Sequence, residues 1–350
     1  MTRKIRLISL LLVISVILLA GMAQAEAKIQ KIGVLSLLDM SEQGYAQIEK
    51  TRVAAAALLD EDAPGAELSQ EGLIADEPEI IYFDHLNDLI LALNAGTIQA
   101  ADLPMEVASY AAARNEGLRV ISIVAPEEDV DNLDELRDFL WNSVFCCDFS
   151  FMATEENKDL LAEINQAAAG IYDDGTEAQL YETYVLGAIE GDPEVEEIEK
   201  VDSWDTIRVL VTGDMPPIDY MTADGKPTGF NVAMLKEIGK RLQKNIELIP
   251  ADAGSRGHML ANGLADVAFW TRSNVGIVLM NEQGLTTQDW RQLFSLSEEG
   301  SAVTEKIDEL APNFDAEGYA RMDIPEGLTT GNEYYFSTVS TLLVNESVLK

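Results

Sequence analysis

Polar and aromatic residues stand where buried strands are predicted to end, the usual place for a ligand site in α/β proteins. The strand Ile207–Gly213 leads into a turn with Asp214 and Tyr220, and the strand DVAFW ends at Trp270, two residues before Arg272. A guanidinium can anchor an anion, and an aromatic ring can form one wall of a site. The alternatives are a surface position for Arg272, a core position for Trp270 and a turn aromatic at Tyr220.

Three further candidates for ligand binding come from other strand ends. Ser36 follows the first strand of the chain, Asp102 ends a later strand, and Tyr335 lies at the start of the last predicted strand, YYFSTVSTLLV. For Asp102 we favour the alternative that its side chain caps the helix that begins at Pro104.

Catalytic and metal-binding motifs are missing from the sequence. It contains neither G-x-S-x-G nor H-E-x-x-H. Its two histidines, His85 and His258, stand in unrelated contexts, and its two cysteines, Cys146 and Cys147, are adjacent. A strained vicinal disulfide is one possibility, and two ordinary strand residues are the favoured one. We therefore expect no enzyme activity, no cofactor and no metal, although the many carboxylates leave acid–base chemistry as an alternative.

The composition favours a globular acidic protein. Hydrophobic residues make up 47% of the 350 residues, and 61 acidic against 24 basic residues give a net charge of −37. Such a charge repels phosphate backbones, so we expect no nucleic-acid partner. We read the acidic excess as a solvated surface and expect a monomer.

The N-terminus resembles a secretion signal. The basic stretch MTRKIR precedes the apolar run LISLLLVISVILLAGMA and the small-residue pattern at Ala23–Ala25. These features predict a signal peptide over residues 1–25, cleaved near Ala25, and an exported protein. An uncleaved anchor is the alternative, because the apolar run is nearly long enough to span a bilayer.

Strands and helices alternate along the rest of the chain. The segment His85–Asn94 carries leucines and isoleucine at helical spacing, and it lies between the strands Ile80–Phe83 and IQAADL. A helix from Pro104 and the strand Leu118–Val124 follow. This alternation predicts an α/β fold with a parallel sheet. A charged segment with proline, Gly191–Thr206, reads as a linker before a second α/β unit.

The second unit resembles the start of the bacterial extracellular solute-binding proteins, family 3, the type 2 periplasmic binding proteins of amino-acid ABC transporters. The stretch TGDMPPIDYMTADGKPTGFNVAMLKEIGKRL has the family's Pro-Pro turn, hairpin and G-F-D-V motif, with Asn231 for Asp. NGLADVAFW resembles its G-x-x-D strand, and LTTGNEYYFSTVSTLLV resembles the strand that crosses the hinge. The resemblance implies a two-lobed fold that closes on a ligand.

The order of the pieces differs from the family's order. KIGVLSLLDM and IIYFDHLNDLILALNAGTIQAADLP resemble lobe two, which normally follows the hinge strand, yet here they come first. We expect a circular permutation, although a tandem of two truncated domains is an alternative. The expected units are a signal peptide (1–25), lobe two (26–124), the hinge return and C-terminal helices of lobe one (125–190), a linker (191–206), and the lobe-one core with its hinge strand (207–350).

The resemblance implies a small-molecule ligand and an ABC permease as partners. Two departures put a free α-amino acid in doubt: Leu37-Leu38-Asp39 replaces the family's Gly-Thr turn, and Pro104 stands where the family has an Asp for the ligand amine. The ligand is then another small polar molecule, or a peptide. The main alternative is a sensing or protein-interaction module with a degenerate pocket, coupled to a membrane sensor.

Overall fold

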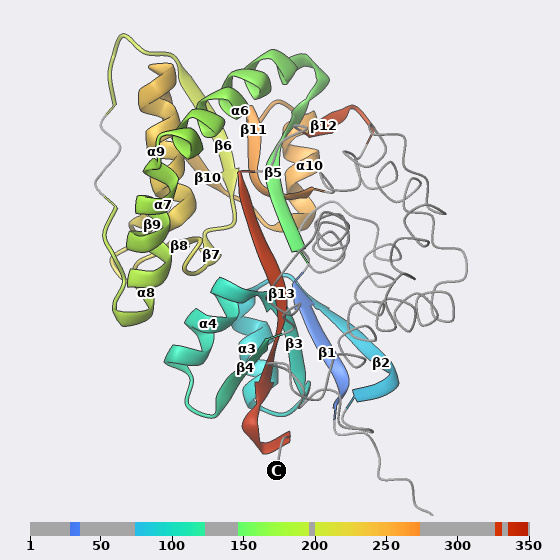
Figure 1. The fold of residues 1–350 in the computed structure, drawn as a ribbon. Helices are drawn as coiled ribbons and strands as arrows, with labels where there is room; N and C mark the ends of the chain where they lie inside the picture. Colours follow the sequence, from blue (N-terminus) through green and yellow to red (C-terminus); the bar gives the residue numbers. More distant parts are fainter. Residues whose placement is uncertain are drawn as a thin grey trace, which may run out of the picture.

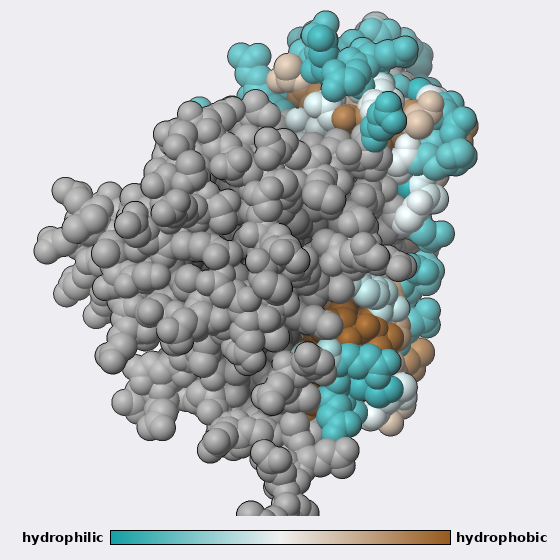
Figure 2. Space-filling view, turned by 90° about the vertical axis from the view of Figure 1, so that its right-hand side faces the viewer, coloured by the Kyte–Doolittle hydropathy of each residue, from teal (hydrophilic) through white to brown (hydrophobic). Residues whose placement is uncertain are grey.

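The structure is a computed structural model, and it describes residues 29–35, 74–122, 146–195, 200–273, 326–330 and 335–348. The predicted signal peptide and Ser36 lie outside the described residues. Among those that are described, no helix is both long and apolar enough to cross a membrane. On the face drawn in Figure 2, hydrophilic residues dominate the described surface, around a small hydrophobic area.

The described chain forms two α/β lobes, one above the other in Figure 1. The lower lobe contains β1 (Ile29–Leu35), β2 (Ile74–Phe83), α3 (Leu86–Asn94), β3 (Ala100–Pro104), α4 (Met105–Arg114) and β4 (Leu118–Ser122). Strand β1 pairs in parallel with both β2 and β3, as the alternation of strands and helices predicts. Helix α3 buries Leu86, Leu89 and Leu93, so the predicted apolar stripe is confirmed.

The upper lobe contains the remaining elements except the last long strand and the 3-10 turn η4 (Glu346–Val348) that follows it. Its strands are β5 (Cys146–Thr154), β6 (Thr206–Val211), β7 (Asp214–Met215), β8 (Asp219–Met221), β9 (Pro227–Thr228), β10 (Asn245–Pro250), β11 (Val267–Ser273) and β12 (Leu328–Thr330). Its helical segments are η2 (Glu155–Asn157), α6 (Lys158–Asp173), α7 (Thr176–Tyr181), η3 (Glu182–Leu186), α8 (Gly187–Glu190), α9 (Phe230–Leu242) and α10 (Ala253–Ala261). Strand β6 pairs in parallel with β10 and β11, and β5 joins this sheet antiparallel to β11.

Strand β13 (Phe336–Asn345) belongs to both lobes. Its first part, Phe336–Val339, pairs with β5 of the upper lobe. Its second part pairs with β3 over Ser340–Val344 and with β4 over Thr341–Asn345 of the lower lobe. One sheet path therefore runs from β10 through β13 to β2, and Figure 1 shows β13 in red passing from one lobe to the other.

An aromatic cluster packs where β13 leaves the upper lobe. Phe336 is 2% exposed, and its ring centroid lies 5.2 Å from that of Phe230, 6.2 Å from that of Tyr181 and 6.4 Å from that of Phe149. These rings come from α9, α7 and β5, which are distant in sequence. The cluster therefore fixes the upper end of the strand that both lobes share.

Both cysteines lie on β5, as the favoured interpretation of Cys146 and Cys147 predicts. After β5, a 3-10 turn (η2) is followed by α6, which ends at Asp173. One sequence prediction needs correction: Asp102 does not cap α4, because it lies inside β3 and the N-cap position belongs to Pro104.

We expect Phe336→Ala to lower the free energy of unfolding by about 3–5 kcal/mol, because it removes a fully buried ring and leaves a cavity. Urea unfolding followed by circular dichroism measures the change. The control is Leu91→Ala, at a side chain that is 65% exposed on α3, where a change within about 0.5 kcal/mol is expected. Equal effects of the two substitutions would contradict the role given to the cluster.

Candidate functional site

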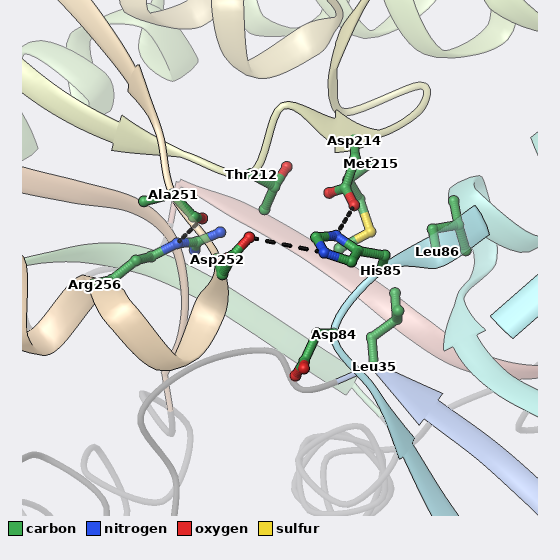
Figure 3. A pocket seen from close by; sticks show the side chains of 10 residues that line it. All are labelled: Leu35, Asp84, His85, Leu86, Thr212, Asp214, Met215, Ala251, Asp252 and Arg256. Atoms are coloured by element: carbon green, nitrogen blue, oxygen red, sulfur yellow. Dashed lines mark hydrogen bonds and ion pairs between the residues drawn. The ribbon is translucent and has the colours of Figure 1, made fainter. Parts of the chain in front are cut away.

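A polar pocket lies where the two lobes face each other (Figure 3). Its cavity volume is about 20 Å³, roughly the room of one water molecule. The lower lobe contributes Leu35, Asp84, His85 and Leu86, and the upper lobe contributes Thr212, Asp214, Met215, Ala251, Asp252 and Arg256. The pocket is thus built from both lobes, as a site that closes on a ligand requires.

Strand ends supply most of the pocket residues. On the lower lobe, Leu35 ends β1 and His85 stands between β2 and α3. On the upper lobe, Thr212 follows β6 and Ala251 follows β10. Because parallel strands bring their carboxyl ends to one edge of a sheet, each lobe presents this edge to the cleft.

Asp219 organises the hairpin that carries Asp214. Its side chain is 1% exposed and accepts hydrogen bonds from the Thr212 hydroxyl, the Gly213 amide and, at 3.0 Å, the Asn231 side-chain amide. This buried carboxylate holds the end of β6, the turn and the start of α9 together. These hydrogen bonds therefore fix the position of the hairpin, and with it the position of Asp214.

The turn between β7 and α9 also satisfies the first amides of α9. The peptide bond between Pro216 and Pro217 is cis, and the Pro217 and Ile218 carbonyls accept hydrogen bonds from the Phe230 and Asn231 amides. The N-cap residue Gly229 has φ 108°, and a Cβ there would overlap the Ile218 carbonyl. Only glycine fits this close approach, so the G-F-N-V motif has a structural explanation.

His85 reaches across the cleft to two carboxylates of the upper lobe. Its Nδ1 lies 2.9 Å from Asp214 Oδ2, and its Nε2 lies 3.9 Å from Asp252 Oδ1. The hydrogen bond and charge of Asp214 raise the pKa of His85, with a smaller contribution from Asp252. Burial raises the pKa of the Asp214 carboxyl, and the contact with His85 opposes that shift.

Arg256 places a buried positive charge beside the pocket. Its side chain is 1% exposed, Nε donates to the Ala251 carbonyl at 3.3 Å, and Nη1 donates to the Phe269 carbonyl at 3.3 Å. The residue lies on α10, the helix that follows Asp252. Its charge helps the nearby Asp214 carboxyl to ionise despite that group's burial.

A second set of contacts joins the lobes on the other side of the β7–β8 hairpin. Asp192 Oδ1 accepts hydrogen bonds from the Tyr110 hydroxyl at 2.9 Å, Arg114 Nη2 at 2.8 Å and the Tyr220 hydroxyl at 3.2 Å. Tyr110 and Arg114 belong to α4 of the lower lobe, whereas Asp192 and Tyr220 belong to the upper lobe. Burial raises the pKa of Tyr110 to about 12, so its hydroxyl stays a donor at neutral pH.

Glu106 connects α4 to the upper lobe close to β13. Its Oε1 accepts from the Tyr181 hydroxyl at 3.0 Å, and its Oε2 accepts from the Thr338 hydroxyl. Burial raises the pKa of this carboxyl, and the two hydroxyl donors partly oppose the shift. Both oxygens of the Glu106 carboxylate thus accept hydrogen bonds, and these bonds connect α4 of the lower lobe to Tyr181 and to Thr338 of β13.

Of the predicted site residues, Asp214 lines the pocket. Tyr220 is buried on β8 of the hairpin, where its hydroxyl donates to Asp192. Asp102 is buried on β3. Tyr335 packs in the core, with its ring stacked 4.2 Å from that of Phe269.

Two more candidates lie on β11: Trp270 and Arg272, of which Arg272 pairs through its backbone with Phe149. Ser36 follows β1 directly but lies outside the described residues. The roles of all these residues in binding stay predictions.

Sequence reasoning missed His85, Asp252 and Arg256. His85 and Asp252 each follow the end of a parallel strand, and that position was the available signal. Arg256 lies within a short helix, where one arginine carries no local sign of burial. Among the described residues, no group of three or more metal-ligating side chains comes together.

One segment of the chain matches a known protein family. Residues 207–274 match the family model of bacterial extracellular solute-binding proteins, family 3. The match confirms the predicted resemblance, and it covers the segments that supply the upper-lobe side of the pocket. This segment of the α/β fold is thus similar to solute-binding proteins. A search among characterised proteins finds no match.

Solved structures with a similar arrangement include components of import systems. One is the ligand-binding component of an ABC-type import system from Staphylococcus aureus with zinc bound, at 12% identity and a TM-score of 0.35 over 91% of this chain and 66% of that chain. Another is a phosphate-binding protein of a phosphate ABC transporter from Streptococcus pneumoniae, at 10% identity and a TM-score of 0.30 over 91% of this chain and 88% of that chain. A third is an alkanesulfonate-binding protein from Xanthomonas axonopodis pv. citri, at 9% identity and a TM-score of 0.33 over 87% of each chain. This chain thus spans slightly less than two thirds of the Staphylococcus protein. TM-scores below 0.5 are too low to indicate a ligand for this chain.

We expect Asp219→Ala to lower the free energy of unfolding by about 3 kcal/mol, because the buried Asn231 amide and two partly buried donors lose their shared acceptor. Chemical unfolding followed by fluorescence measures the loss. Asp224→Ala is the matched control, since this aspartate of the β8–β9 turn is 65% exposed and a change within about 0.5 kcal/mol is expected. A loss below about 1 kcal/mol for Asp219→Ala would show that the hairpin does not depend on this carboxylate.

Proposed function

We propose that the protein is an exported solute-binding protein that captures a small polar solute between its lobes by hinge closure. The observation that carries the proposal is the pocket in which His85 of the lower lobe meets Asp214 and Asp252 of the upper lobe. The family match over residues 207–274 supports the same role. An ABC permease is the proposed partner, and the periplasm or outer surface is the proposed location.

The charges at the pocket narrow the choice of solutes. Three carboxylates, of Asp84, Asp214 and Asp252, line it together with one guanidinium and one imidazole. The guanidinium of Arg256 already donates to backbone carbonyls. An organic cation or a zwitterion therefore matches the charges of the described residues better than an anion does.

A thermal-shift screen of amino acids, peptides and polyamines tests this proposal. A true solute at a hundredfold excess over its dissociation constant stabilises the native protein by about 2.7 kcal/mol. Asp214→Asn is then expected to weaken binding by about tenfold to a hundredfold, because a buried charged contact is lost. Titration calorimetry with the solute found in the screen measures the change in affinity.

The control for the binding experiment is Asp224→Asn, which removes the same charge at an exposed turn outside the pocket. We expect its affinity to equal that of the unaltered protein. Unaltered affinity in Asp214→Asn would remove this residue from the site. If no compound in a broad panel shifts the melting temperature, the sensing or interaction module becomes the better account.

We also propose that the two lobes are assembled in circularly permuted order. Support comes from the sheet of the lower lobe, in which β3 pairs with both β1 and β13. Ile32 faces Ala100, and Ala100 faces Val344, so the start of β1 and the end of β13 lie on either side of the start of β3. Strands β1 and β13 are therefore separated by two strand spacings, about 10 Å, and a short peptide can span this distance.

A relinked chain tests the permuted order. It joins Lys350 to Ala27 through a glycine-rich linker and opens new termini between Glu194 and Lys200. We expect it to fold with a free energy of unfolding within about 2 kcal/mol of the original, because the same strands pair and surface cuts are tolerated. Circular dichroism and urea unfolding provide the comparison. A relinked chain that stays unfolded, beside a soluble parent, would contradict the proposal.

A further inference from the structure

His85 joins the lobes through a contact that depends on its protonation. In Figure 3 its ring points between Asp214 and Asp252, and dashed lines connect it to both carboxylates. The Nδ1–Oδ2 distance of 2.9 Å is that of a charge-assisted hydrogen bond when the imidazole is protonated. His85 is half exposed, so protons from solvent reach it directly.

The groups around His85 are almost all acidic. Asp214 faces it from β7, Asp252 from the N-cap position of α10, and Asp88 from α3, and each of these raises the pKa of the imidazole. Asp84 precedes His85 at the end of β2 and lines the same pocket. Arg256 of α10 is the one cation among the pocket-lining residues, and its guanidinium donates to carbonyls of the upper lobe.

We propose that His85 is a proton-controlled latch that holds the two lobes together across the mouth of the cleft, in the absence of any solute. Protonated His85 attracts two carboxylates of the opposite lobe. Neutral His85 keeps at most one hydrogen bond and loses the charge attraction. The closed form therefore binds a proton more tightly than the open form does, and acidification favours closure by linkage.

The direction of the pH effect follows from the two partners. The pKa of His85 is raised in the closed form, so the latch is complete below the ordinary histidine pKa of about 6.5 and is lost as pH rises through the raised value. The pKa of Asp214 is also raised, by burial, so strong acid protonates this carboxyl and weakens the latch again. Closure is thus expected to be favoured most in mildly acidic solution, about pH 6.

The chain offers a matched control, because it contains two histidines. His258 lies on α10, and its ring nitrogen Nε2 is 3.1 Å from the side chain of Asn262 of the same lobe. His258→Gln therefore removes an imidazole without touching the cleft. His85→Gln removes the charge of the latch while it keeps a side chain that forms hydrogen bonds.

The experiment measures the distance between the lobes by fluorescence energy transfer. Dyes are attached to cysteines placed at the exposed positions Leu91, on α3, and Leu264, before β11, in a protein with Cys146→Ser and Cys147→Ser. Between pH 6 and pH 8 we expect the ratio of closed to open molecules to fall about two- to fivefold, the range of an exposed ion pair. The same fall is expected in His258→Gln and none in His85→Gln.

Two results would overturn the proposal. One is a distance that does not change with pH in the unaltered protein. The other is a change that persists in His85→Gln, which would assign the effect to another titrating group between the lobes, such as Glu106. An imidazole titration by nuclear magnetic resonance adds a check: the pKa of His85 should fall in Asp214→Asn. No solute is present in any of these measurements. The proposal about His85 can therefore be tested even if the thermal-shift screen finds no solute.

Discussion

The hydrogen bonds of β13 to three other strands are the constraint on which the two-lobed structure depends. The first half of the strand pairs with β5, and the second half pairs with β3 and β4. Pairing and packing hold the strand in both sheets. The aromatic rings around Phe336 at the upper end and the buried Leu342, Leu343 and Val344 at the lower end supply that packing.

The contacts between the lobes differ in exposure. Near β13, Glu106 accepts hydrogen bonds from Tyr181 and Thr338, whereas Asp192, which accepts from two tyrosines and an arginine, is 47% exposed. At the pocket, His85 is 50% exposed. Exposed ion pairs separate at a lower cost than enclosed polar groups with satisfied hydrogen bonds do. The Glu106 contact is therefore expected to open last.

Much of the fold follows from local patterns, and the site follows only in part. Three elements can be identified from local sequence: α3 from its leucine spacing, α9 from the G-F-N-V motif at its start, and β13 from its run of strand-forming residues. In each case a short stretch of sequence determines the local structure. Asp214 was predicted from the turn that holds it. His85 was missed because its partner lies 129 residues away on the other lobe, and no local pattern encodes how the lobes meet. Arg256 was missed because burial of one arginine depends on the sheet beneath it.

Hydrogen exchange with and without solute tests most directly whether capture occurs between the lobes. The first solute that raises the melting temperature is used, and amide exchange is followed by mass spectrometry. With solute bound, we expect slower amide exchange on both lobes together: in residues 84–86 of the lower lobe and in residues 212–215 and 251–256 of the upper lobe. These segments carry the residues that line the pocket. Protection confined to one lobe, or found away from these segments, would contradict capture between the lobes.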